Sequence, residues 1–186
     1  MHKYKTIFYY IDDFNKKDIL KLDKRIILIY RNYNKITHHK KILNFVKFCK
    51  KHKYKLYISN NYKLAIKYKL DGLYIPSFNK SLKYKNLNAP KKMDIIGSAH
   101  NISEIIIKKK QQCSKIFISP IFKSKNSRKM LGVVRFNLML VNFKSKFIAL
   151  GGVNEKNLKL LNLTKVLGVA AISWIKKNRP RKTRPV

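Results

Sequence analysis

The chain alternates between short apolar runs and longer basic stretches. The apolar runs are five to eight residues long and rich in Ile, Val, Tyr and Phe, the residue types that favour β-strands. We therefore predict strands at residues 6–11, 25–30, 55–59, 71–75, 94–99, 115–121, 146–150 and 166–173.

The stretches between these runs carry apolar residues at a spacing that suits one face of a helix. The clearest case is residues 39–52, where Ile42, Phe45, Val46 and Cys49 lie close to one face. Asn154 is the expected cap of a later helix. The predicted helices cover residues 39–52, 64–68, 103–112, 134–143 and 154–163, with a poor one at 80–87 and a last one from 174 onward.

Strands that alternate with helices predict a parallel sheet. Eight such units favour a (β/α)8 TIM barrel over an open sheet, in the α/β class. The chain has 186 residues, so the barrel must be a compact one compared with the roughly 250 residues of a typical barrel. We expect one barrel domain at residues 1–177 and a basic, disordered tail at 178–186, where Pro and Arg are frequent.

The net charge is +36, from 44 basic and 8 acidic residues. Such a charge attracts polyanions without specificity. However, 37 of the basic residues are Lys and only 7 are Arg, and they are spread along the chain, which is not the clustered arginine pattern of nucleic-acid recognition. Compositional drift explains the excess as simply as a nucleic-acid partner does.

Other features of the sequence indicate a cytoplasmic protein. The longest uninterrupted apolar run, residues 166–175, is too short to span a bilayer, and the N-terminus does not read as a signal peptide. Two cysteines are too few for a disulfide framework or a cysteine-based zinc site. The sequence leaves homo-oligomer formation open.

Active sites of TIM barrels lie at the carboxyl ends of the strands. There the sequence places few carboxylates, which disfavours metal sites and paired-carboxylate hydrolysis. Gly151 and Gly152 after the seventh strand, with Ser173 after the eighth, suit a phosphate. Arg31 is a candidate anion ligand, and His100 is either a general acid–base group or a structural residue. A polar loop after the sixth strand reads as a lid or as a plain surface loop, and contains Lys123, Ser124, Lys125, Arg128 and Lys129.

The second half of the chain resembles the thiamine phosphate synthase/TenI family. Five segments carry this resemblance, in the order and at the spacing of the family motifs: DGLYI at 71–75, IGSAH at 96–100, SPIF at 119–122, ALGGVN at 149–154 and GVAAIS at 168–173. The resemblance implies a barrel that joins hydroxymethylpyrimidine diphosphate to thiazole phosphate and releases pyrophosphate.

The resemblance also implies roles for individual residues. Arg31 and Ser98 would contact the diphosphate, and Ser124 would take the place of the first Thr of the lid motif. The thiazole phosphate would be held by Gly151, Gly152 and Ser173. The family's magnesium-binding Asp pair falls on Asn61 and Asn79, and the loss of two negative charges weakens a site for this hard cation.

Three functions therefore stay open. The first is a divergent synthase in which lysines partly replace the metal. The second is a TenI-type thiazole tautomerase, which needs no metal and for which the resemblance implies His100 as the acid–base group. The third is a non-catalytic barrel that binds phosphorylated small molecules or polyanions. In the first two, the partners are phosphorylated pyrimidine and thiazole compounds, and no membrane is involved.

Overall fold

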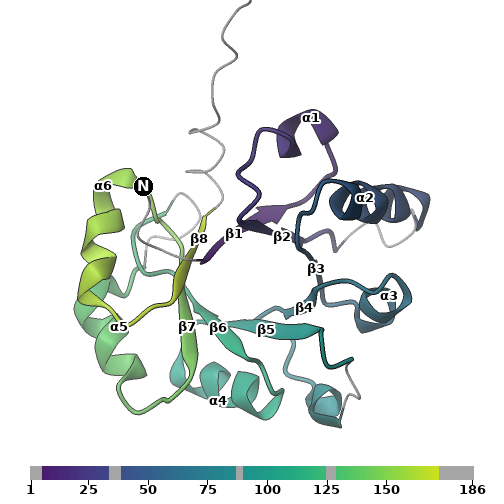
Figure 1. Cartoon of the computed structure of the whole chain (residues 1–186). Helices are drawn as coiled ribbons and strands as arrows, with labels where there is room; N and C mark the ends of the chain where they lie inside the picture. Colours follow the sequence, from purple (N-terminus) through teal and green to yellow (C-terminus); the bar gives the residue numbers. More distant parts are fainter. Residues whose placement is uncertain (1–5, 34–38, 87–89, 125–128, 172–186) are drawn as a thin grey trace, which may run out of the picture.

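A computed structural model describes residues 6–33, 39–86, 90–124 and 129–171. Its centre is a closed barrel of eight strands in which each strand pairs in parallel with its sequence neighbours and β8 pairs with β1. This confirms the predicted TIM barrel, and Figure 1 shows the helices arranged around the ring of strands. The strands are β1 (Thr6–Ile11), β2 (Ile26–Tyr30), β3 (Leu56–Ser59), β4 (Gly72–Ile75), β5 (Asp94–Ala99), β6 (Lys115–Ile118), β7 (Lys146–Leu150) and β8 (Gly168–Ala171).

Most of the described helices outside the barrel are short, which explains how eight strand–helix units fit into 186 residues. Among the helices that the structure describes, only α2 (His39–Lys51) has the length of an ordinary barrel helix. The poor helix predicted at 80–87 is the 3-10 helix η1 (Leu82–Asn86), and the helix predicted at 154–163 divides into α6 (Glu155–Leu158) and the 3-10 helix η2 (Lys159–Leu163). The remaining helices are α1 (Lys16–Ile19), α3 (Tyr62–Lys67), α4 (Ile102–Lys110) and α5 (Gly132–Leu140).

The apolar core has two layers, because side chains of a strand alternate between its faces. One layer lies between the strands and the helices and includes Leu28, Phe45, Leu73 and Ile105. The other fills the inside of the barrel and is strongly aromatic: Phe8 packs edge-to-face on Tyr57 and Phe117. The barrel is therefore a packed core and no channel.

A polar group closes the amino-terminal end of the barrel interior. The carboxylate of Asp94 accepts hydrogen bonds from the Tyr57 and Ser114 hydroxyls and forms an ion pair with Lys115 at 2.5 Å. Burial, followed by the charge of Asp94, raises the pKa of Tyr57. These groups lie at the end opposite to the one where barrel enzymes carry their chemistry, so we assign them to stability.

Two further expectations can be compared with the fold. Asn154 caps α6, and its side chain and that of Asn157 form a reciprocal capping box. Cys49 is buried and Cys113 is half-buried, and both are free thiols.

Among the described residues, no helix has the length and apolar character needed to cross a membrane. The expected tail at 178–186 lies outside the described residues.

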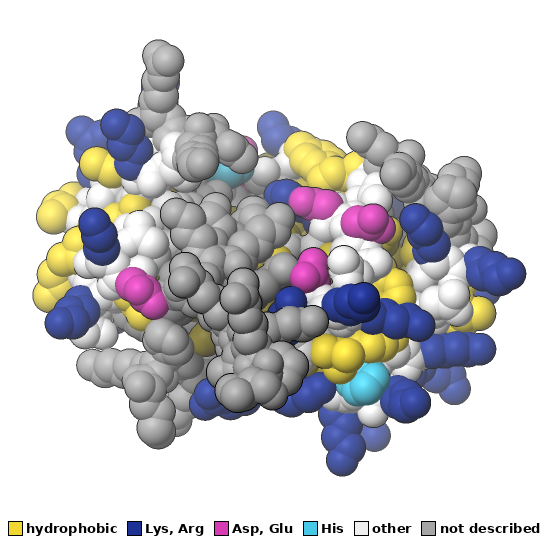
Figure 2. Space-filling model, turned by 90° about the horizontal axis from the view of Figure 1, so that it is seen from above, with side chains coloured by type: hydrophobic (Ala, Val, Ile, Leu, Met, Phe, Trp, Pro, Cys, Tyr) yellow, Lys and Arg dark blue, Asp and Glu magenta, His cyan; other side chains and the backbone are white. Residues whose placement is uncertain are grey.

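Figure 2 shows Lys and Arg side chains on both sides of the face it presents, with few Asp and Glu between them. This agrees with the spread of lysines along the sequence.

Candidate functional site

The carboxyl ends of the strands and the segments that follow them form one opening of the barrel, which we call the mouth. Its floor carries two tyrosines, Tyr10 from β1 and Tyr74 from β4, whose rings meet edge-to-face with centroids 5.5 Å apart. The Tyr74 hydroxyl donates a hydrogen bond of 2.8 Å to Oγ of Ser98 on β5. Ser98, a sequence candidate, is therefore placed inside the mouth and is buried.

The hydroxyl of Tyr10 is buried beside the Tyr74 hydroxyl, and among the residues that the structure describes no hydrogen-bond partner lies in good geometry for it. Burial raises the pKa of Tyr10 well above its ordinary value. A buried hydroxyl without a partner is costly and usually needs an explanation in the chemistry of the site. It suits the recognition of a polar ligand group at the mouth.

Arg31 follows β2 and lies over this floor. Its guanidinium carbon is 5.2 Å from the centre of the Tyr10 ring, a cation–π distance. Its Nε donates to Oδ1 of Asp12 at 3.2 Å, in an ion pair whose carboxylate is largely exposed. An exposed pair of this kind contributes little, so the guanidinium keeps donors for an anion.

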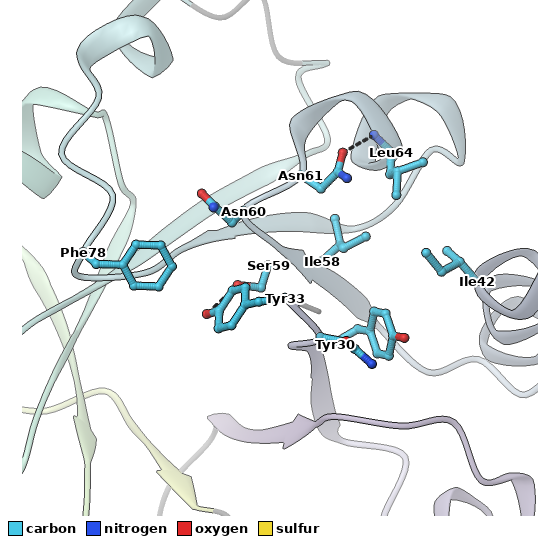
Figure 3. Close-up of a pocket in the computed structure, with 10 residues that line it drawn as sticks. Tyr30, Tyr33, Ile42, Ile58, Ser59, Asn60, Asn61, Leu64 and Phe78 are labelled. Carbon is cyan, nitrogen blue, oxygen red and sulfur yellow. Dashed lines mark hydrogen bonds between the residues drawn. The ribbon is translucent and has the colours of Figure 1, made fainter. Parts of the chain in front are cut away.

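A pocket of about 200 Å³ opens beside the mouth, between the ends of β2 and β3 and the helices α2 and α3. Tyr33 and Phe78 cover it with rings that meet edge-to-face at 5.4 Å, and Ser59 donates a hydrogen bond to the Tyr33 hydroxyl (Figure 3). Its polar lining consists mainly of amides and hydroxyls, without a carboxylate. It has the shape and chemistry for a flat, polar ring.

Three asparagines, Asn60, Asn61 and Asn79, form what we call the amide corner of the mouth. Asn61 is turned towards α3, where its Oδ1 accepts a hydrogen bond of 3.0 Å from the Leu64 N–H, as Figure 3 shows. Asn60 has a positive φ of 56°, and its Oδ1 accepts from Nδ2 of Asn79, which follows β4. The structure thus brings Asn79 together with Asn60, whereas the sequence interpretation paired it with Asn61.

A buried lysine holds the segment that carries Phe78 and Asn79 in place through hydrogen bonds to its main chain. Nζ of Lys108, on α4, donates to the main-chain oxygens of Pro76 and Asn79 at 2.8 Å each and to Oε1 of Gln111 at 2.9 Å. Gln111 in turn donates to the main-chain oxygens of Asn79 and Ser81. Desolvation lowers the pKa of Lys108 to about 8. All three acceptors of the ammonium are neutral, so its charge is not cancelled by a direct carboxylate partner.

His100 follows β5 at the rim of the mouth. Its Nδ1 lies 2.7 Å from the main-chain oxygen of Ser119, which assigns the proton of the neutral ring to Nδ1 and leaves Nε2 as an acceptor. The His100 main-chain N–H donates to Glu104. The ring is thereby oriented, as an acid–base group requires, although the same contact also suits a structural role.

The loops after β6 and β7 meet at the two glycines that the sequence singled out. Gly151 and Gly152 have φ values of 90° and 69°, which side chains rarely adopt. A Cβ on Gly152 would lie 2.4 Å from the main-chain oxygen of Lys123 and 2.5 Å from that of Phe122. The start of the expected lid therefore packs directly on this turn, and only glycine allows the approach.

Several sequence candidates cannot be placed. Ser173, Lys125 and Arg128 lie outside the described residues. Lys123, Ser124 and Lys129 are described and lie on either side of residues 125–128. Sequence reasoning missed Tyr10, Tyr74 and Lys108 as parts of the site, and it placed Asn60 on the rim without a role. The signal for the tyrosines was present, because alternation along β1 and β4 directs both inward.

The amide corner does not fit a magnesium ion. Magnesium prefers carboxylates in octahedral geometry, and the carbonyl oxygens of Asn61 and Asn79 each accept a protein hydrogen bond, from Leu64 and from Ser81. Across the described ranges, no group of three or more His, Cys, Asp or Glu side chains could hold a metal ion. We therefore derive no step through a metal.

The fold and the site define a class of protein: a parallel eight-stranded barrel whose mouth carries an arginine, buried hydroxyls and an amide corner. The chain belongs to the TMP-TENI family, described as thiamine monophosphate synthase, whose family model matches residues 18–175. This confirms the family that the five motifs indicated.

A curated relative is a thiamine-phosphate synthase from Prochlorococcus marinus subsp. pastoris, 27% identical over 151 residues. The match covers 78% of this chain and 42% of the relative, so the chain spans less than half of that protein's length.

Solved structures of two proteins named thiamine phosphate pyrophosphorylase share the fold. The one from Pyrococcus furiosus has a TM-score of 0.71 at 16% identity, over 92% of this chain and 87% of that chain. The one from Bacteroides thetaiotaomicron has a TM-score of 0.61 at 17% identity, over 98% and 89%. KGPDC from Streptococcus mutans has the same barrel, with a TM-score of 0.69 at 9% identity over 96% and 92%. These likenesses establish the barrel.

Proposed function

We propose that this chain is a synthase of the thiamine phosphate type, which joins hydroxymethylpyrimidine diphosphate to thiazole phosphate and releases pyrophosphate. Its membership of the family supports this. The observation that carries the proposal is the separation of two candidate anion sites at one mouth. Arg31 follows β2, and the Gly151–Gly152 turn follows β7, with β1 and β8 between them. Two phosphorylated substrates need two such places.

In this proposal Arg31 binds the diphosphate and stabilises the charge that develops as it departs. Ser98, which accepts from Tyr74, and the buried Tyr10 hydroxyl supply further polar contacts. The bond between the pyrimidine methylene carbon and the diphosphate oxygen breaks, and the thiazole nitrogen then forms a bond to that carbon. The electron pair of the broken bond leaves with pyrophosphate.

The aromatic lining has a role in this reaction. Tyr33 and Phe78 cover the pocket, which takes the pyrimidine ring, and their faces attract the positive charge on the pyrimidine after the diphosphate leaves. The protein thereby acts by positioning and charge stabilisation and needs no covalent nucleophile.

The second substrate is held at the other side of the mouth. The backbone N–H groups of the Gly151–Gly152 turn bind the thiazole phosphate, and Lys123 supplies a positive charge beside it. This placement rests on the close packing of the Lys123 main chain against Gly152.

One observation favours the tautomerase as a second candidate. His100 has its Nδ1 fixed by the Ser119 carbonyl, which leaves Nε2 ready to accept a proton at the rim. A tautomerase moves a proton on one thiazole ligand, so it requires no pyrimidine substrate.

The test is the incubation of purified protein with both substrates, with each substrate alone, and with magnesium or a chelator. We expect thiamine phosphate and pyrophosphate in equal amounts, and we expect Arg31→Gln to lower kcat/KM by about 10²-fold or more, as loss of a transition-state cation does. Tautomerisation of the thiazole compound without pyrimidine would favour the second candidate. Bound thiazole phosphate without turnover of either kind would leave a binding protein.

A further inference from the structure

The corner of the mouth between β3 and β4 is where the family resemblance locates a magnesium ion, and here it has different chemistry. The side chains that face each other across it are Asn60 and Asn79, which hydrogen-bond directly, amide to amide. Asn79 also donates through the same Nδ2 to the Tyr84 hydroxyl at 3.2 Å. An approaching cation would meet the N–H hydrogens of Asn79, which repel it.

The carbonyl oxygens of the amide corner are engaged within the protein. Oδ1 of Asn60 accepts from Asn79, Oδ1 of Asn79 accepts from the Ser81 N–H at 3.0 Å, and Oδ1 of Asn61 caps α3. The main-chain oxygen of Asn79 accepts from both Lys108 and Gln111. A cation would have to break this network and would gain only neutral ligands, which are poor compensation for the loss of its water shell.

The charge near the corner opposes a cation as well. The buried ammonium of Lys108 is fixed 2.8 Å from the Asn79 main-chain oxygen, and its other two acceptors are also neutral. Charges inside a protein interact more strongly than charges in water. This ammonium therefore disfavours a second cation and favours an anion at the mouth.

We infer that Asn60 and Asn79 form an amide latch that joins β3 to the segment after β4 and excludes divalent cations, so that the protein binds its phosphorylated ligands without a bridging metal. The exclusion of cations stands on the latch itself. The statement about phosphorylated ligands rests on the proposed function.

The first test measures cation binding without any organic ligand, by titrating Mn²⁺ and following free Mn²⁺ by electron paramagnetic resonance. The wild-type chain is expected to show no saturable binding in the millimolar range. The double variant Asn60→Asp/Asn79→Asp is expected to bind one ion. At constant ionic strength its melting temperature is expected to rise with Mg²⁺, while that of the wild type does not. In this variant two carboxylates face each other, and a cation between them relieves their repulsion.

The matched control is Asn61→Asp. It adds the same kind of charge one residue away, but Asp is a good helix cap, so its carboxylate stays on the Leu64 N–H. This variant is expected to bind no Mn²⁺. Asp also tolerates the positive φ at position 60. If the double variant does not fold, Asn60→Asp alone is titrated in its place. This single variant keeps the hydrogen bond from Asn79, and a smaller increase in Mn²⁺ affinity is expected.

Saturable binding of one Mn²⁺ to the wild type, lost in Asn79→Leu, would overturn the inference. So would a folded double variant that binds no more Mn²⁺ than Asn61→Asp does. These outcomes are independent of whether the chain makes thiamine phosphate. A second titration, of thiazole phosphate by calorimetry with Mg²⁺ or with a chelator, is expected to give the same affinity in both. An affinity at least tenfold higher with Mg²⁺ would contradict metal-free ligand binding.

Discussion

The hydroxyl of Tyr74 donates a 2.8 Å hydrogen bond to Oγ of Ser98, and both groups are buried at the floor of the mouth. This contact links β4 to β5 at the level where a ligand would enter the barrel. It also means that Ser98 cannot be changed without affecting a second residue, because the Tyr74 hydroxyl depends on it for an acceptor.

We therefore expect Ser98→Ala to lower the free energy of unfolding by about 1–3 kcal/mol, the cost of leaving the Tyr74 hydroxyl unpaired. The double variant Ser98→Ala/Tyr74→Phe, which removes both partners, is expected to recover part of this loss. Urea unfolding of the wild type, both single variants and the double variant measures the coupling. Strictly additive losses would show that the hydrogen bond contributes nothing to stability.

Tyr10→Phe is expected to have the opposite effect on stability. It removes a buried hydroxyl that has no partner among the described residues, so the free energy of unfolding is expected to rise by about 1 kcal/mol. Binding of the pyrimidine diphosphate, measured by calorimetry, is expected to weaken in the same variant.

Tyr54→Phe is the matched control for this change. The Tyr54 hydroxyl is also buried, but it donates towards the main-chain oxygens of Ile19 and Leu22 at 2.8 and 2.9 Å. The same loss of one oxygen is expected to destabilise the protein there. Destabilisation by both variants would contradict the assignment of Tyr10 to ligand binding.

Two of the glycines with positive φ, Gly132 and Gly152, allow steric and conformational effects to be separated. Gly152→Val is expected to weaken thiazole phosphate binding by at least about tenfold, because its Cβ would displace the backbone of Phe122 and Lys123. Gly132 has a similar φ of 67°, but a Cβ there meets nothing within 4 Å. Gly132→Val is therefore expected to cost only the backbone strain, about 1–2 kcal/mol, and to leave binding unchanged.

Circular dichroism of both variants serves as the check that the barrel stays folded. Unchanged affinity in folded Gly152→Val would mean that the phosphate binds elsewhere.

The thiols predict how stability depends on alkaline pH. Burial raises the pKa of Cys49 and of Cys113 to about 12 each in the folded protein, above the ordinary value of 9.0. The unfolded chain loses these protons first, so the thiols lower the stability progressively as the pH rises from about 9 towards 12. Cys49→Ala/Cys113→Ala is expected to show a smaller loss than the wild type over this range in pH-dependent urea unfolding.

The same burial predicts slow reaction with an aromatic disulfide reagent at pH 8, followed by release of two equivalents on unfolding. Rapid reaction of a folded thiol would contradict the assigned burial.

The net charge of +36 predicts a marked effect of salt. Repulsion among the lysines destabilises the compact state and is screened at a Debye length of about 10 Å in 0.1 M salt. The melting temperature is therefore expected to rise between low and moderate concentrations of sodium chloride. A fall over this range would argue against net repulsion.

The sequence by itself determined the barrel and the general place of the site. Short runs such as TIFYYI and KFIAL have no polar interruption, because strands of a parallel barrel are buried on both faces, and their number and alternation with basic helices predicted the topology. The glycine turn after β7 was also predictable, because two adjacent glycines at a strand end indicate a close approach of backbones.

The tertiary structure decided which neighbours meet at the mouth. Asn60 and Asn61 are adjacent and chemically identical, and only the left-handed backbone at Asn60 directs one amide to Asn79 and leaves the other to cap α3. Lys108 is one of three consecutive lysines on α4, and nothing in the local sequence distinguishes it from the other two. Its burial depends on the main chain of the segment after β4, which lies 32 residues earlier in the sequence. Contacts between such distant segments are not encoded in local periodicity.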